Sequence, residues 1–406
     1  MKKKILIIDD SALMRRVLCD IINSDDRFEV VDMAKDGAEG FKLLTAHKYD
    51  GVVLDVYMPK MTGLDMLREM QKSKVYANVL MASTTTGEGA RETIEALDLG
   101  AVDFIKKPEN VANARHADFK THFLNTLYAV TQARSSHMQT AGRYTSGRAS
   151  TFTQRFDVNI HTRQSGADRL SAQSTSAVKM ATEARKHLSD ITDGKVGKRE
   201  DVSRLVHDIP SRMGKKIVAI ASSTGGPRAL QAVIPKLPKN LKAPVLLVQH
   251  MPKGFTKSLA ERLSSLGEIP VTEAVDGEVL KVGHVYIAQG GLHMNADHKG
   301  GDTYVIRYSD EPTREGVKPC ANYMYESLAT SRFDEIVCVV LTGMGSDGTA
   351  GILNLKKKKN VRVIAQDEET STVYGMPKSV ALAGVVNEVV PLDSIADHII
   401  KNVGVY

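Results

Sequence analysis

The chain has 406 residues, which is too long for one ordinary domain and is typical of two or three domains. Hydrophobic residues make up 42% and charged residues 25% of it, a balance that excludes a wholly disordered or membrane-embedded protein. No apolar run approaches the roughly 20 residues that span a bilayer, and Asp9 ends the first apolar run too early for a signal peptide. We therefore expect a water-soluble protein that stays in the cytoplasm.

The net charge of +6 raises the question of a nucleic-acid partner. Thirteen basic and eight acidic residues lie between residues 135 and 214, so most of the excess is confined to one segment. No helix-turn-helix or basic recognition helix is evident, so we expect no nucleic-acid binding. The three cysteines, Cys19, Cys320 and Cys338, lack the spacing of a zinc site and are expected to be reduced, buried thiols.

Residues 1–134 alternate short β-branched runs with stretches of helical periodicity, which is the pattern of a parallel α/β sheet. The expected strands are Ile5–Ile8, Phe28–Asp32, Gly51–Leu54, Asn78–Ala82 and Ala101–Ile105. Apolar helical stripes, such as the one from Leu13 to Ile22, separate them. The pattern predicts one compact domain with a five-stranded parallel sheet.

Residues 135–214 have a different composition, dominated by Ser, Thr, Gln, Ala, Gly and Arg and without a sustained apolar period. A long, flexible linker is the simplest interpretation. Residues 177–188 could form a short helix, although such a helix would bury little by itself.

Strand-like runs return in residues 215–406 and are mostly separated by helical stretches. The expected strands are Ile217–Ala221, Pro244–Gln249, Val285–Ala288, Ile336–Leu341 and Val361–Gln366. This alternation predicts a second, doubly wound α/β domain.

Charged and polar residues stand at the ends of four expected strands in the first domain. Asp9 and Asp10 follow the first strand, Asp55 ends the third, Ser83 ends the fourth and Lys107 follows the fifth. The carboxyl ends of parallel strands meet at one edge of a sheet, where three carboxylates would repel unless a cation such as Mg²⁺ joined them. For Asp10 the alternative is a helix cap, because the first helical stripe begins almost at once.

The segments Ile8-Asp9-Asp10-Ser11, Leu54–Pro59 and Lys106-Lys107-Pro108 resemble those of response-regulator receiver domains, which have a flavodoxin-like fold. The resemblance implies that Asp55 accepts a phosphoryl group from a histidine kinase. It further implies that Mg²⁺ is held by Asp9, Asp10, Asp55 and the Tyr57 carbonyl. Ser83 and Lys107 would then sense the phosphoryl group, and Phe104 would be the aromatic switch residue.

Three catalytic residue types stand at strand ends of the second domain. Ser222 and Ser223 begin a Gly-rich turn, His250 ends the second strand, and Asp347 lies in the loop after the fourth. Each alone is more typical of a tight turn or a structural strand end. Together at one sheet edge they form the nucleophile, base and orienting acid of a hydrolase triad.

The same loop also matches a dinucleotide-binding fingerprint, Gly343-x-Gly345-x-x-Gly348, with Asp367 nearly 20 residues further on. That fingerprint belongs to the first strand and helix of a domain, whereas fewer than about 60 residues follow here, too few for a Rossmann sheet. An oxidoreductase therefore stays the less favoured alternative.

The segments Ile220–Gly226, Gln249–Pro252 and Leu341–Gly348 resemble those of the chemotaxis methylesterase (CheB) family. The resemblance makes Ser223, rather than Ser222, the nucleophile, with His250 as general base and acid and Asp347 as its orienting partner. Backbone donors near Thr224 and Met344 would form the oxyanion hole. No metal or organic cofactor is expected at this site.

This family resemblance implies a function as well as a fold. The expected substrates are glutamyl methyl esters on chemoreceptors, with glutamine deamidation as a second activity and phosphorylation of the receiver as the activating signal. The enzyme would act at receptor arrays without being embedded in the membrane. A signalling adaptor without esterase activity is the alternative from another functional class.

Overall fold

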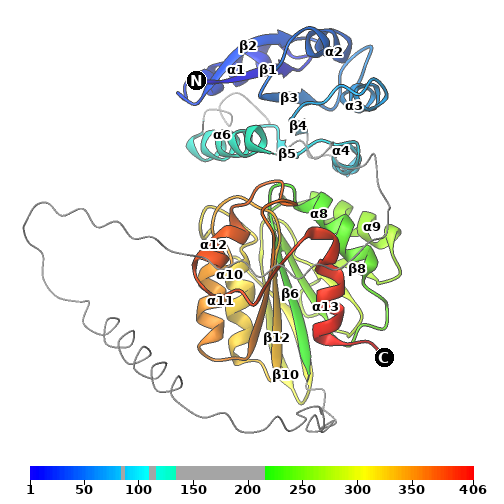
Figure 1. Cartoon of the computed structure of the whole chain (residues 1–406), viewed down its shortest axis with the longest axis vertical. Helices are drawn as coiled ribbons and strands as arrows, with labels where there is room; N and C mark the ends of the chain where they lie inside the picture. The colour runs from blue at the N-terminus through cyan, green and yellow to red at the C-terminus, as the bar shows by residue number, and fades with distance from the viewer. Residues whose placement is uncertain (84–86, 109–115, 134–214) are drawn as a thin grey trace, which may run out of the picture. The chain divides into compact units, whose positions relative to one another are not determined.

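The computed structural model describes residues 1–83, 87–108, 116–133 and 215–406 (Figure 1). The expected linker, with its short helix over residues 177–188, lies outside the described residues. No helix in the described part of the chain is both long and apolar enough to cross a bilayer.

The N-terminal domain contains the five-stranded parallel sheet that its sequence predicts. The strands are β1 (Lys3–Ile8), β2 (Phe28–Ala34), β3 (Gly51–Asp55), β4 (Val79–Ser83) and β5 (Asp103–Lys106). They lie in the order β2-β1-β3-β4-β5, and every neighbouring pair is parallel. The predicted strand ends agree to within two residues, because buried parallel strands are continuous apolar runs that stand out in a sequence.

Helices cover both faces of this sheet. They are α1 (Ala12–Asn23), α2 (Gly37–Ala46), α3 (Gly63–Lys72), α4 (Gly87–Asp98) and α6 (Ala117–Gln132). Ile5 and Ile7 of β1 pack with apolar residues of α1 and α6, whereas Leu6 and Ile8 pack with those of α2, α3 and α4. This alternation follows from the two-residue period of a strand.

Side-chain caps define where two of these helices begin. Ser11 caps α1 by accepting a hydrogen bond from the Met14 N–H at 3.3 Å. The alternative role of Asp10 as the cap is therefore wrong. Thr62 and Asp65 form a capping box at the start of α3.

The C-terminal domain contains a seven-stranded sheet. Its strands are β6 (Lys216–Ser222), β7 (Val245–Gln249), β8 (Val271–Glu273), β9 (Val285–Ile287), β12 (Glu335–Val340), β13 (Val361–Gln366) and β14 (Glu388–Val390). The order is β14-β13-β12-β6-β7-β9-β8, with all neighbours parallel. The sequence predicted five of these strands and missed β8 and β14, which have three residues each and are too short to show a period.

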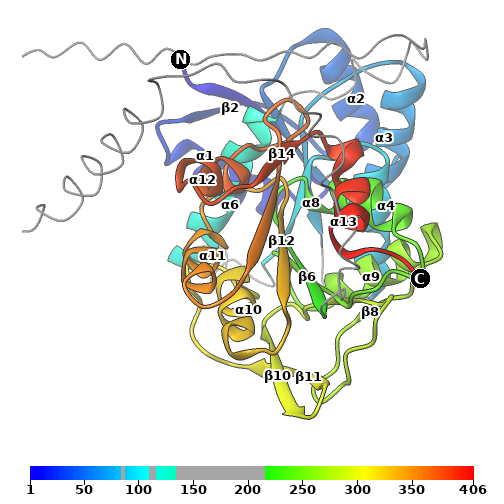
Figure 2. The same cartoon turned by 60° about the horizontal axis from the view of Figure 1, so that its bottom comes forward.

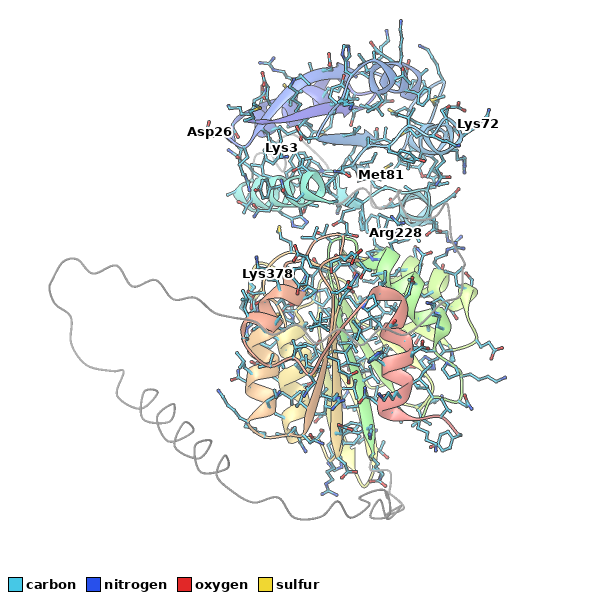
Figure 3. All side chains as sticks on the ribbon, viewed as in Figure 1. Lys3, Asp26, Lys72, Met81, Arg228 and Lys378 are labelled. Carbon is cyan, nitrogen blue, oxygen red and sulfur yellow. The ribbon has the colours of Figure 1, made fainter. Side chains whose placement is uncertain are left out.

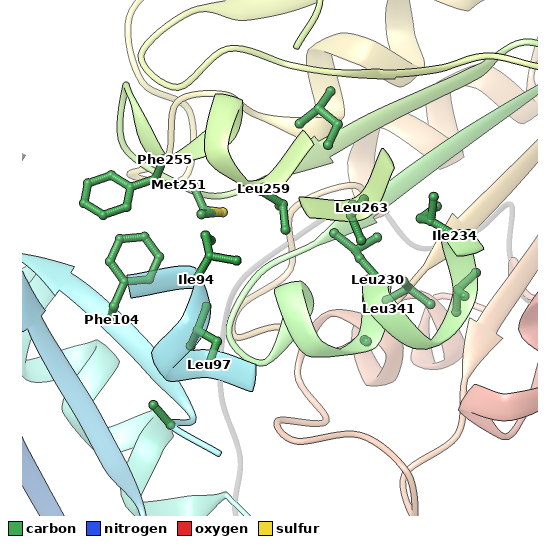
Figure 4. Close-up of a cluster of buried hydrophobic side chains, with 14 of the residues drawn as sticks. Ile94, Leu97, Phe104, Leu230, Ile234, Met251, Phe255, Leu259, Leu263 and Leu341 are labelled. Atoms are coloured by element: carbon green, nitrogen blue, oxygen red, sulfur yellow. The ribbon is translucent and has the colours of Figure 1, made fainter. Parts of the chain in front are cut away.

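Helices again cover both faces, which confirms the doubly wound architecture (Figure 2). One face carries α8 (Gly226–Val233), η3 (Ile234–Lys236), α9 (Phe255–Leu266), η5 (Leu392–Ser394) and α13 (Ile395–Val403). The other carries α10 (Ala321–Ser327), η4 (Leu328–Thr330), α11 (Thr349–Lys356), α12 (Met376–Leu382) and the hairpin β10 (His293–Gly300) and β11 (Thr303–Ser309). The sequence did not predict this hairpin. Figure 4 shows Leu230 and Ile234 beside Leu259 and Leu263, side chains that join α8 and η3 to α9.

Replacing Gly63 by Ala is expected to destabilise the N-terminal domain. A Cβ atom at this first position of α3 would lie 2.2 Å from the Asp55 carbonyl oxygen, which is a backbone atom that cannot move away cheaply. We expect a loss of about 1–3 kcal/mol in the free energy of unfolding, measured by urea denaturation. Lys72→Ala is the control, because Lys72 lies at the exposed end of the same helix (Figure 3). Equal stability of Gly63→Ala and the wild type would contradict the close approach.

Candidate functional site

The predicted nucleophile lies on a tight turn between β6 and α8. Its N–H donates to the Thr342 carbonyl at 3.0 Å, and its own carbonyl accepts from the Gly226 N–H at 2.7 Å. Gly225, which precedes the helix, has a φ of +76°, a conformation that favours glycine. The turn therefore holds Ser223 at the carboxyl edge of the sheet, next to the loop after β12.

His250 follows β7, the neighbour of β6, and its N–H donates to the Ser222 carbonyl at 3.1 Å. Its ring Nε2 lies 2.7 Å from Oδ2 of Asp347. Because Nε2 meets the carboxylate, Nδ1 is the ring nitrogen left to accept a proton. Among the described residues Ser223 Oγ makes no hydrogen bond to this ring, and such contacts often tighten only when substrate binds.

Asp347 is buried and is surrounded by donors. Oδ2 accepts from the Ala321 N–H at 2.6 Å, and Oδ1 accepts from the Asn322 N–H and the Cys320 thiol, both at 3.0 Å. Burial alone would raise its pKa, but the hydrogen bonds from His250, Cys320 and Ala321 outweigh burial and lower the pKa to about 2. The carboxylate is thus charged at any pH at which the protein works.

Cys320 contributes to this arrangement as a donor rather than as a nucleophile. Burial first, and the neighbouring Asp347 charge second, raise the pKa of its thiol to about 12. The thiol therefore keeps its proton. Cys320 and Cys338 are both buried free thiols, whereas Cys19 is partly exposed, which corrects the expectation that all three are buried.

The sequence predicts an oxyanion hole from the backbone N–H groups near Thr224 and Met344. Within the described residues, neither the Thr224 N–H nor the Met344 N–H donates a hydrogen bond to the protein. The carbonyls around them are satisfied, since Thr224 accepts from the Thr342 hydroxyl and Gly343 accepts from two N–H groups. The two N–H groups are thus available to bind an oxyanion, as are those of Gly225 and Gly345, which also lack a protein acceptor in the described part of the chain.

Sequence reasoning missed Gln249, a fully buried amide that joins two of the turns. Its Oε1 accepts from the Ser222 hydroxyl at 2.7 Å, and its Nε2 donates to the carbonyls of Ser223 and His250 at 3.0 and 3.2 Å. The signal for it was a polar residue at the end of an apolar strand. Gln249 ties the backbone of the nucleophile to that of the base.

The N-terminal domain carries a second polar cluster at the carboxyl edge of its sheet. Asp9 and Asp55 are buried and Asp10 is exposed, and each offers a carboxylate oxygen within 4.8 Å of the others. The Lys107 ammonium lies 2.6 Å from Asp9 and 2.6 Å from Asp55. Oδ2 of Asp9 is buried and, within the described residues, its contact is the ion pair with Lys107, so a cation bound by Asp9 would compete with this lysine.

The pKa of Asp55 is shifted upward, whereas that of Asp347 is shifted downward. Burial raises its pKa to about 6, and the nearby Asp9 charge adds to this, while Lys107 and the Tyr57 N–H only partly offset them. Oxygen ligands of this kind suit a hard divalent ion such as Mg²⁺, whose charge would favour the ionised form of Asp55.

The two other predicted receiver residues, Ser83 and Phe104, lie on the neighbouring strands β4 and β5. Ser83 is the last residue of β4, and its hydroxyl accepts from Thr93 at 2.7 Å and lies 3.3 Å from the Gly89 carbonyl of α4. Phe104 is buried in β5. Thr93 was not singled out from the sequence, because its contact with Ser83 depends on how α4 packs.

Comparison with known proteins identifies both domains. Residues 5–117 match the family model of the response regulator receiver domain, and residues 218–399 match that of CheB methylesterase. The crystal structure of the CheB methylesterase catalytic domain of Thermotoga maritima is 44% identical, covers 46% of this chain and 98% of its own, and has a TM-score of 0.45.

Full-length relatives carry both domains together. A protein-glutamate methylesterase/protein-glutamine glutaminase of Geobacillus kaustophilus is 38% identical over 99% of both chains. Its counterpart in Pyrococcus abyssi is 37% identical over 99% of this chain and 94% of its own. These relatives do not support an adaptor or an oxidoreductase. The chain therefore belongs to the CheB family of chemotaxis methylesterases, which are carboxylic ester hydrolases joined to a response-regulator receiver domain.

Proposed function

We propose that Ser223, His250 and Asp347 hydrolyse glutamyl methyl esters on methylated chemoreceptors to glutamate and methanol. The observation that carries this proposal is the hydrogen bond between Nε2 of His250 and Asp347 at the same sheet edge as the Ser223 turn. The same site would deamidate receptor glutamines, because an amide differs from the ester only in its leaving group.

In the proposed reaction, Ser223 Oγ attacks the ester carbonyl and gives its proton to Nδ1 of His250. Asp347 stabilises the resulting imidazolium through Nε2. The N–H groups of Thr224 and Met344 bind the oxyanion of the tetrahedral intermediate. His250 then protonates the departing methanol, and a water molecule activated by the same ring releases the acyl group.

We further propose that Asp55 accepts a phosphoryl group from a histidine kinase and that Mg²⁺ is held by Asp9, Asp10, Asp55 and the Tyr57 carbonyl. The ion would neutralise charge on the phosphoryl group during transfer. Lys107, which lies between two of these carboxylates, would pair with the phosphoryl oxygens, with Ser83 and Phe104 responding to its arrival.

The proposed organisation assigns residues 1–134 to the receiver, 135–214 to a flexible linker and 215–406 to the catalytic domain. Phosphorylation would shift the population toward a form in which the esterase is more active. Because chemoreceptors present their methylated segments to the cytoplasm, the enzyme would work there, at receptor arrays.

Ser223→Ala is expected to lower methanol release from methylated receptor membranes by about 10⁴ to 10⁶, because the remaining donors only bind and polarise the ester. Substrate binding should change little, since the hydroxyl contributes mainly to the transition state. The measurement is methanol released per enzyme at saturating receptor, with and without acetyl phosphate and Mg²⁺.

Ser222→Ala is the matched control, since it removes the same hydroxyl one residue earlier, where it bonds Gln249 rather than substrate. We expect this variant to keep activity within about tenfold of the wild type. A Ser223→Ala enzyme that retained wild-type rates would exclude the proposed nucleophile.

Without a divalent cation, the Asp55 carboxyl is expected to titrate near pH 6, above the ordinary value of 3.8. A raised pKa means that the carboxylate, which is the nucleophile toward phosphodonors, is depleted as pH falls through 6. Mg²⁺ stabilises the anion, so it should move the midpoint to lower pH. Carbon-13 NMR of the labelled carboxyl measures the midpoint with and without Mg²⁺.

Asp10→Asn provides the comparison, because it removes one proposed ligand while leaving the buried carboxylates in place. In this variant Mg²⁺ should shift the Asp55 midpoint only at much higher concentration. An ordinary midpoint near pH 4 without the ion, or an unchanged response to Mg²⁺ in Asp10→Asn, would contradict the assignment.

A further inference from the structure

The starts of α10 and α11 cap each other, and the acid of the proposed triad is one of the two caps. Asp347 lies just before α11, and its carboxylate accepts from the N–H groups of Ala321 and Asn322 in the first turn of α10. The first N–H groups of a helix have no partner inside that helix. Asp347 therefore supplies acceptors that α10 lacks.

The side chain of Asn322, which lies on α10, in turn caps the start of α11. Its side-chain Oδ1 accepts from the N–H groups of Gly348 and Gly351 at 3.1 and 2.6 Å. Gly348 is the residue before α11, and Gly351 lies in its first turn. One side chain thus satisfies two helix-start donors directly after Asp347 in the chain.

The side-chain nitrogen of Asn322 is connected, through Glu315, to Ser346, the residue before Asp347. It donates to Oε1 of Glu315 at 2.7 Å, and Oε2 of Glu315 accepts from the Ser346 hydroxyl at 2.6 Å. Asn322 therefore restrains the residue before Asp347 and the residue after it. The Asn322 side chain is completely buried, whereas the bond between Ser346 and Glu315 is exposed.

The starts of α10 and α11 are closely packed. A Cβ atom on Gly351 would lie 2.8 Å from both the Cα and the carbonyl oxygen of Asn322, so the two helix starts are already in close contact. Oδ2 of Asp347 is shared between the Ala321 N–H and the His250 ring. Any change in where the loop holds Asp347 is therefore transmitted directly to the ring.

We propose that Asn322 is a positioning residue of the triad, which aims the Asp347 carboxylate at His250 by accepting the N–H groups of Gly348 and Gly351. The proposal rests on the role assigned to Asp347 above. A positioning residue differs from an ordinary helix cap, because a cap would contribute only to the free energy of unfolding and not to kcat.

The first test compares Asn322→Ala with Asn322→Asp in methanol release from methylated receptor membranes. Asn322→Ala removes the acceptor, and kcat is expected to fall by about tenfold to a hundredfold while KM stays within about twofold. Asn322→Asp keeps an oxygen facing both N–H groups but turns its second oxygen toward Oε1 of Glu315, so it is combined with Glu315→Gln, whose amide can donate to that oxygen. The kcat of this double variant should recover to within about fivefold of the wild type. Asn354→Ala is the control, since this exposed amide on α11 bonds Glu326 and Lys357 and, within the described residues, nothing near Asp347.

The second test repeats Asn322→Ala in an Asp347→Asn background. If Asn322 acts through Asp347, removing its side chain in this background should lower kcat by less than about threefold, because the effects of residues that act as a unit are not additive. If Asn322 had only a structural role, Asn322→Ala would lower kcat by the same factor in both backgrounds, and that result would overturn the proposal. Unchanged kcat in Asn322→Ala would overturn it as well.

Failure of this inference differs from failure of the proposed function. If Asp347→Asn alone kept wild-type activity, the proposed triad would be wrong. If Asp347→Asn were impaired but Asn322→Ala were not, only the positioning role would be wrong. Thermal unfolding checks each variant, and if Asn322→Ala does not fold, Glu315→Ala carries the same comparison in both backgrounds, with an expected loss of a few-fold in the wild-type background only.

Discussion

The ionised Asp347 carboxylate is the interaction on which the rest of the catalytic domain depends. A buried charge is costly unless donors surround it, and here an imidazole, a thiol and two backbone N–H groups do so. Those donors come from the residue after β7 and from the start of α10. Holding one carboxylate therefore orders the loop after β12, the entry to α10 and the ring of His250 together.

Both domains use the same geometric device. In each, the carboxyl ends of neighbouring parallel strands bring together side chains that are far apart in the chain. In the catalytic domain the loops after β6, β7 and β12 meet, and they carry Ser223, His250 and Asp347. In the receiver the ends of β1, β3 and β5 bring Asp9, Asp55 and Lys107 into contact.

The two central carboxylates are both buried, yet their chemistry differs because their neighbours differ. Asp347 receives several donors and has a pKa of about 2, so it is a permanent anion that can stabilise an imidazolium. Asp55 lies beside another carboxylate and has a pKa of about 6 without a cation, so its charge responds to what binds next to it. One environment suits a fixed orienting group, and the other suits a regulated nucleophile.

The sequence by itself determined the two parallel sheets and the strand-end positions of the proposed site residues, because long apolar strands and their polar ends are local patterns. The tertiary structure decided what those patterns could not express. It placed the cap of α1 on Ser11 rather than Asp10 and added the short strands β8 and β14. It also revealed two buried amides, Gln249, which joins the turns after β6 and β7, and Asn322, which joins the starts of α10 and α11. Their partners lie on separate elements, at a sequence distance of 26 residues for Gln249 with Ser223 and 29 for Asn322 with Gly351. Such contacts depend on how helices and strands pack, and no periodicity along the chain records them.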